Sequence, residues 1–200
     1  MENTRTGKYL PSSTSLFFPS SLFPFPIFYF LCEIIFPTLQ LPKQTMATQK
    51  AAQWAASLTY SSLPPDALQA AIRSFYNWVG CTVGGSNHPA ASIARNSLSR
   101  FFGSPTSTLL GTNGLQADAQ HAALINGIAS HVHDYDDTHL ETIIHPTGPI
   151  AAALLSFAQS LDRPVSGQDF LAALAAGIEL ECKAGLAVWP SHYDVGWYVC

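Results

Sequence analysis

The residues with the clearest capacity for chemistry lie close together in the chain, between His121 and His145. Five of the seven histidines fall in this interval, together with Asp134, Asp136 and Asp137. An imidazole titrates near neutral pH, and a buried carboxylate can be tuned towards the same range. In a chain with only 11% charged residues, this local density predicts acid/base chemistry on a carboxylic acid.

The elements around this cluster determine where its side chains point. If the predicted helix continues past His131, then Asp134 and Thr138 share one helical face with it. His145 precedes Pro146, and the residue before a proline avoids helical geometry, so we expect its imidazole to enter a cleft from a loop. We therefore predict that Asp134, Thr138 and His145 converge on one hollow of the size of an anion.

Two other interpretations of the cluster stay open. The His131-x-His133 pair is similar to the HxH of metal-dependent hydrolases, but residues two apart on a helix diverge by about 200°. We therefore expect no metal at that pair. The histidines and aspartates can also serve only to cap helices and to solvate a turn, and His121 and His133 are expected to be structural.

A second polar segment stands near the end of the chain, where Ser191, His192, Tyr193 and Asp194 follow Pro190. It is predicted to be an irregular loop rich in hydrogen-bonding groups, and such loops often line sites. A Ser-His-Asp triad is disfavoured here, because neighbours in sequence rarely adopt the relay geometry.

The rest of the chain is predicted to be all-α, a multi-helix bundle or array. Apolar residues recur at helical spacing, whereas the alternation typical of strands is almost absent. The predicted core stripe consists of Leu68, Ile72, Phe75, Tyr76 and Val79. The pair Gly84-Gly85 is expected to end that helix, and Gly127 to allow another backbone to come close. The helical segments are 47–58, 62–85, 91–103, 117–133, 150–161 and 168–188, with a looped link over 104–115.

Composition excludes several classes of protein. With 9 Lys and Arg against 13 Asp and Glu, the chain lacks the basic field that a nucleic-acid partner requires. The 4 cysteines form no CxxC pair, which disfavours a zinc ribbon and a disulfide framework and is typical of a reducing, intracellular compartment.

Residues 1–45 differ in composition from the rest and are interpreted as a leader outside the domain, which spans 46–200. Their apolar run 27–36 contains Glu33 and is about half of the ~20 residues that a membrane span needs, so no membrane partner is expected. A translation start at Met46 is favoured over a targeting role. That start predicts the cytoplasm, and a real leader would allow the mitochondrion.

Two motifs in this order carry a resemblance to a known family. HDYDDTHLETIIHPTGP, followed later by GIELECKAGLAVWPSHYDVGWY, is similar to the MmgE/PrpD family, which includes 2-methylcitrate dehydratase and cis-aconitate decarboxylase. The similarity runs from about Thr48 to the end. It implies a large helical domain, only part of which is present, and a smaller α+β lid domain that is absent. It also implies a homodimer at full length, with no metal and no organic cofactor.

The resemblance also implies roles for individual residues. Asp134, Thr138 and His145 match catalytic positions. The substrate-binding positions are His139, Ser191, His192 and Tyr193. The family's further catalytic lysine and histidine would fall after residue 200, and Tyr198 stands where the family commonly has histidine.

The implied activity is that of a lyase, which removes water or carbon dioxide from a small tricarboxylic acid by cofactor-free acid/base catalysis. The first alternative is a non-catalytic helical module for binding or dimerisation. The second is a metal-dependent hydrolase.

Overall fold

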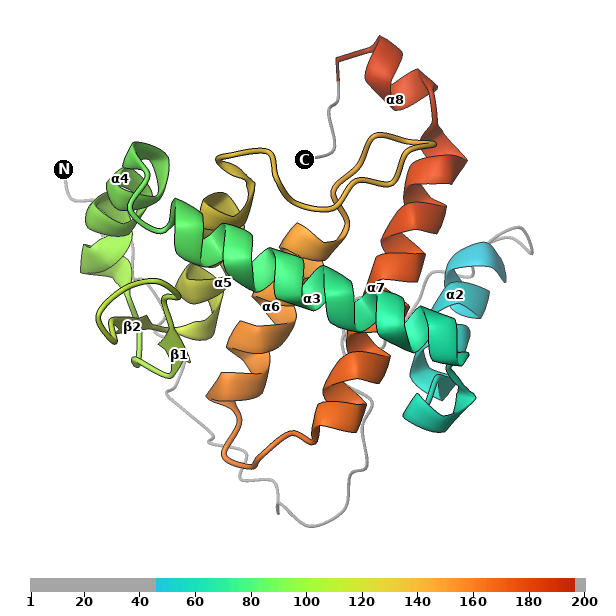
Figure 1. Cartoon of the computed structure of the whole chain (residues 1–200), viewed down its shortest axis with the longest axis horizontal. Helices are drawn as coiled ribbons and strands as arrows, with labels where there is room; N and C mark the ends of the chain where they lie inside the picture. Colours follow the sequence, from blue (N-terminus) through green and yellow to red (C-terminus); the bar gives the residue numbers. More distant parts are fainter. Residues whose placement is uncertain (1–45, 197–200) are drawn as a thin grey trace, which may run out of the picture. The chain divides into compact units, whose positions relative to one another are not determined.

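The computed structural model describes residues 46–196 (Figure 1). The predictions for residues 1–45, including the apolar run 27–36, and the expectation for Tyr198 lie outside the described residues. None of the helices in the described range is both long and apolar enough to cross a bilayer.

The all-α prediction is confirmed, because helices account for nearly all regular structure between residues 46 and 196. The α-helices are α2 (Met46–Ser57), α3 (Pro65–Gly85), α4 (Pro89–Leu98), α5 (Ala119–His131), α6 (Thr147–Ser160), α7 (Gly167–Val188) and α8 (Ser191–Asp194). Short 3-10 turns are η1 (Tyr60–Ser62) and η2 (Ser99–Phe101). In the expected link, β1 (Ser107–Thr108) pairs antiparallel with β2 (Gln116–Ala117), and Ser107 lies opposite Ala117.

Local chemistry explains where several of these helices begin. Pro65 opens α3, where a missing N–H costs nothing. The Asp118 carboxylate accepts hydrogen bonds from the backbone amides of Gln120 and His121 at the start of α5, and the Ser166 hydroxyl accepts one from Asp169 in α7.

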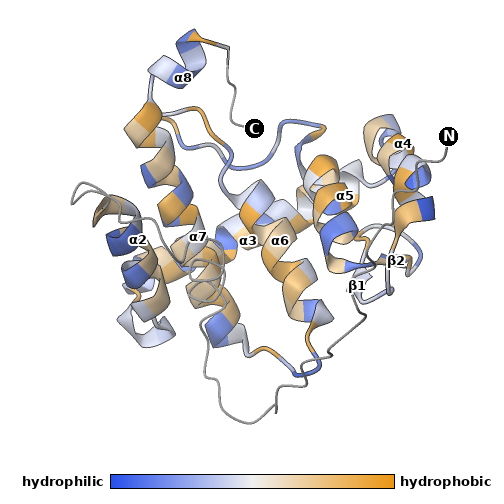
Figure 2. Ribbon diagram, turned by 180° about the vertical axis from the view of Figure 1, so that it is seen from behind, coloured by the Kyte–Doolittle hydropathy of each residue, from blue (hydrophilic) through white to orange (hydrophobic). Residues whose placement is uncertain are grey.

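Helix α3 packs across α5, α6 and α7, so it is the element that joins the others (Figure 1). Its Trp78 is completely buried and stacks on Phe75, with 5.6 Å between ring centroids. Helix α6, apolar over most of its length (Figure 2), contributes Ala151 and Ala152 to the same core, and α7 contributes Leu174.

One member of the predicted core stripe was wrong. Leu68, Ile72, Phe75 and Val79 are half-buried, but Tyr76 is 75% exposed. Successive helical residues are about 100° apart, so Tyr76 lies at the edge of the stripe that contains its neighbour Phe75, on the side open to solvent.

Helices α3 and α5 approach each other closely at Gly85, where α3 ends as predicted. A Cβ added there would collide with the backbone carbonyl of Ala129 in α5. At Gly127, the position expected for such an approach, an added Cβ would meet only the Ala152 side chain at an ordinary 3.8 Å. Gly85 therefore sets the spacing between α3 and α5.

This difference predicts opposite effects for two adjacent substitutions. Gly85→Ala is expected to lower the free energy of unfolding by about 1–3 kcal/mol, because the backbone of α5 must move. Gly84→Ala is the matched control: nothing lies within 4 Å of an added Cβ there, so the better helix former should stabilise by about 0.5–1 kcal/mol. Urea unfolding measures both. Equal effects of the two variants would contradict the close approach.

Candidate acid/base site

The predicted cluster occupies a loop, not a helix. Helix α5 ends at His131, where the backbone amide of Asp134 donates to the His131 carbonyl at 2.9 Å and closes a turn. Asp134 itself has φ of 54°, a left-handed conformation that Asp tolerates better than most residues. The conditional expectation that the helix carries Asp134 and Thr138 on one face is therefore wrong.

The second half of the loop is a tight turn anchored on α7. The backbone amide of His139 donates to the Ile144 carbonyl at 2.8 Å, and its imidazole Nδ1 shares a hydrogen bond of 2.7 Å with the Thr142 hydroxyl. Thr142 and Ile144 are buried. They face Gly185, where an added Cβ would lie 3.0 Å from Ile144 Cδ1, so the loop position depends on the absence of a side chain at Gly185.

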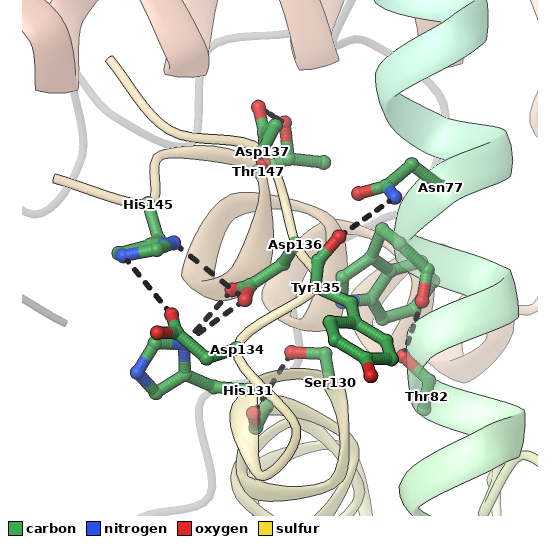
Figure 3. Close-up of polar contacts among 12 residues, drawn as sticks. Asn77, Thr82, Ser130, His131, Asp134, Tyr135, Asp136, Asp137, His145 and Thr147 are labelled. Carbon is green, nitrogen blue, oxygen red and sulfur yellow. Dashed lines mark hydrogen bonds and ion pairs between the residues drawn. The ribbon is translucent and has the colours of Figure 1, made fainter. Parts of the chain in front are cut away.

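At the centre of the site, the Asp136 carboxylate lies between two imidazoles (Figure 3). His131 Nδ1 donates to it at 3.0 and 3.1 Å, and His145 Nδ1 lies 3.5 Å from Asp136 Oδ1. The Asp136 side chain is only 2% exposed. Burial of a carboxylate is costly without a compensating partner, and the hydrogen bonds from His131 supply one.

His145 faces carboxylates on both of its ring nitrogens. Its Nε2 lies 3.7 Å from Asp134 Oδ1, with side-chain exposures of 11% for His145 and 76% for Asp134. Its Nδ1 is buried and forms no hydrogen bond to any described residue. One imidazole is thus held between a buried and an exposed carboxylate, which is a suitable environment for a group that gains and loses a proton.

Thr138 does not join this arrangement. It is exposed, and within residues 46–196 its hydroxyl forms no hydrogen bond with Asp134 or His145. The structure therefore brings Asp134 and His145 together, and it adds Asp136, which sequence reasoning did not select. Three aspartates in four residues gave no local signal of which one points inward.

Asp137 lies against the start of α6. Its Oδ2 accepts a hydrogen bond of 2.6 Å from the buried Thr147 hydroxyl and a longer one, 3.5 Å, from Ser74 in α3. The positive end of the helix dipole favours a carboxylate in this position.

The segment after α7 is also more regular than expected, because Ser191–Asp194 form the short helix α8. Ser191 Oγ donates to the Val188 carbonyl at 2.8 Å. The His192 imidazole packs against the Trp189 indole, with ring centroids 5.6 Å apart. Tyr193 packs on the same indole at 5.6 Å. In the described part of the chain, no hydrogen bond or ion pair joins Ser191 or His192 to the Asp136 cluster, which consists of His131, Asp134, Asp136 and His145.

The two histidines expected to be structural lie apart from Asp136. His121 Nδ1 is 2.6 Å from Asp118, the capping residue of α5. The ring of His133 packs edge-on against His88, with centroids 5.5 Å apart. The HxH pair is therefore split, and only His131 reaches Asp136. The cause differs from the one expected, because α5 ends at His131 and His133 lies in the turn after the helix.

Glu181 is an additional acidic residue that the sequence reasoning missed. Burial in α7, followed by the negative charge of Asp137, raises its pKa to about 7. Glu181 lies one helical turn before Gly185, so both are on the α7 face that meets the loop. That spacing was visible in the sequence, but nothing in it marked Glu181 as buried.

The turn at Ile143 provides a test of how the loop is held. Ile143 has φ of 58°, which is strained for a β-branched residue, and its side chain is 49% exposed. Ile143→Asn should therefore raise the free energy of unfolding by about 1 kcal/mol in urea titrations. Ile143→Val keeps the branch and should give no gain. An Asn variant less stable than the Val variant would refute the strain.

Glu181 predicts a pH dependence of stability. Its carboxyl ionises near the ordinary 4.5 when unfolded and near 7 when folded, so unfolding releases a proton between these values. Stability should fall as pH rises from about 4.5 to 7 and then stay constant. Glu181→Gln should remove this fall, measured as urea unfolding at pH 5 and pH 8.

Glu179→Gln is the control for that experiment. Glu179 is exposed and pairs with Lys183 at 2.8 Å, so its replacement should leave the fall in place. An unchanged slope in the Glu181 variant would show that other groups cause it.

Comparison with known proteins finds relatives whose names include cis-aconitate decarboxylase. The cis-aconitate decarboxylase-like protein oryM of Aspergillus oryzae is 27% identical over 157 residues, 76% of this chain and 32% of that protein. Human cis-aconitate decarboxylase is 31% identical over 117 residues, 57% of this chain and 24% of its own length. The mouse protein of the same name is 36% identical over 87 residues, 42% of this chain and 17% of its own.

The matched region spans about a third or less of each of these relatives. A family model described as the MmgE/PrpD N-terminal domain matches residues 49–199. This range contains the whole Asp136 cluster and all helices from α3 to α8. Since the match extends over most of the sequence, the chain belongs to the MmgE/PrpD family.

Proposed function

We propose that the polypeptide containing this chain is a lyase that acts on a small tricarboxylic acid, with cis-aconitate decarboxylation as the first candidate reaction. The observation that carries the proposal is the nearly buried His145 imidazole, held between Asp136 at 3.5 Å and Asp134 at 3.7 Å. The relatives named as cis-aconitate decarboxylases support the substrate.

The chemistry needs one group that transfers a proton at carbon. In decarboxylation, the bond to a carboxylate breaks, its electron pair stays on the carbon skeleton, and a proton is added to carbon as carbon dioxide leaves. A protonated His145 would supply that proton. Dehydration of 2-methylcitrate, the second candidate, would instead use a neutral His145 to remove a proton next to a carboxylate. The electron pair left on carbon would form the double bond as the neighbouring hydroxyl group leaves, and that group would take up a proton to become water.

Both ring nitrogens of His145 face carboxylates, Asp136 at 3.5 Å and Asp134 at 3.7 Å. No organic cofactor or metal is required for either reaction in this scheme. Substrate carboxylates need positive charge, and in the described part of the chain the ion-pair partners of Asp134 and Asp136 are histidines. Further cations would come from the rest of the polypeptide.

The intact polypeptide that carries this chain should therefore turn over cis-aconitate or 2-methylcitrate. Turnover of cis-aconitate is measured as release of carbon dioxide. Turnover of 2-methylcitrate is measured as the rise in ultraviolet absorbance of the unsaturated product. His145→Gln should lower kcat/KM by about 100-fold or more, the usual contribution of a general acid or base. His133→Gln, an exposed residue of the same loop, should retain activity.

Circular dichroism would establish that each variant is folded. Silence of the folded wild-type protein with both substrates would reject the enzymatic proposal, as would equal activities of the two histidine variants.

A further inference from the structure

We propose that His131, Asp134, Asp136 and His145, here called the two-histidine, two-aspartate site, bind a single divalent transition-metal ion of the zinc class. The inference goes beyond the proposed function, in which the same residues act without a metal. An ion in this position would not assist the reaction but would compete with it.

The geometry of the four ligand atoms carries the proposal. One nitrogen or oxygen from each residue lies within 4.8 Å of all the others. Two of the separations meet at one oxygen, Asp136 Oδ1, which lies 3.1 Å from His131 Nδ1 and 3.5 Å from His145 Nδ1. A tetrahedral ion with bonds of 2.0–2.2 Å holds its ligands about 3.4 Å apart. The exposed Asp134 side chain contributes an oxygen within 4.8 Å of the other three ligand atoms and can close on an ion by a small side-chain movement.

A buried nitrogen without a partner points to the same conclusion. His145 is 9% exposed, and its Nδ1 forms no hydrogen bond among residues 46–196. In the tautomer protonated on Nε2, that nitrogen presents a lone pair beside the Asp136 carboxylate. A cation between the two would satisfy the nitrogen and compensate the buried charge of Asp136.

The donor set selects the kind of ion. Two imidazoles with two carboxylates suit Zn²⁺, Co²⁺ or Ni²⁺, whereas Ca²⁺ and Mg²⁺ prefer oxygen ligands and higher coordination. The set also differs from the HxH pair, because His133 packs on His88 and takes no part. Only the fold brings His131 and His145 together, with ring centroids 4.7 Å apart.

Occupation of this site has a consequence for the proposed acid/base role. A histidine ligand must be deprotonated, and its lone pair is used by the metal. His145 cannot then transfer a proton, so zinc-class ions should inhibit the enzyme. This consequence rests on the proposed function, whereas binding of the ion does not.

The test is a titration of the 200-residue chain with Co²⁺, whose visible absorption reports tetrahedral coordination, followed by displacement with Zn²⁺. We expect one ion per chain and no displacement by Mg²⁺. His131→Ala should weaken binding by about 100-fold or more, since it removes a direct ligand. Asp134→Asn, which keeps the size of the side chain and tolerates the left-handed backbone, should also weaken it.

His133→Ala is the matched control and should bind Co²⁺ like the wild type. Absence of a 1:1 complex, or a loss of binding with His133→Ala equal to that with His131→Ala, would overturn the site. The outcomes of the two proposals are separable. If the chain binds the ion but the metal-free intact protein shows no turnover, the lyase proposal is rejected and the metal site is kept. If the intact protein shows turnover that Zn²⁺ does not inhibit, and no Co²⁺ complex forms, the metal site is rejected and the lyase proposal is kept.

Discussion

The structure around the candidate site depends on one buried negative charge. The Asp136 side chain is 2% exposed, and the effective cost of burying such a charge is several kcal/mol unless a partner compensates it. His131 is hydrogen-bonded to this carboxylate and His145 lies 3.5 Å from it, and the two histidines come from opposite ends of the loop. The chain must therefore leave α5 at His131 and turn back through the left-handed Asp134 before Asp136 can reach the first imidazole.

Rigid elements hold this loop from two sides. On one side, Asp137 is hydrogen-bonded to Thr147 in the first turn of α6. On the other, buried Thr142 and Ile144 rest on Gly185 of α7. A long irregular connection of this kind is uncommon unless it has a function. Here both anchors position the imidazole of His145, near the end of the loop. The loop is thus built like part of a site, although it contains no regular structure.

The same region has more acid than base. Burial, and after it the negative charge of Asp137, raise the pKa of Glu181 to about 7. An anionic substrate would meet repulsion there unless positive charge were supplied. Protonated imidazoles supply it in the proposed reaction, and a zinc-class ion supplies it in the proposed competing state. Both proposals therefore start from the same observation, which is the excess of carboxylates around His145.

The sequence by itself determined the helices, the end of α3 at Gly85 and the family motifs, because these depend on local periodicity, glycine and residue identity. Only the tertiary structure decided that Tyr76 faces outward, that α5 stops at His131, and that Asp136 takes the inward position while Thr138 remains exposed. The physical reason is that a loop has no repeating pattern. Its path follows contacts with α3, α6 and α7, which lie far away in sequence and leave no mark on neighbouring residues.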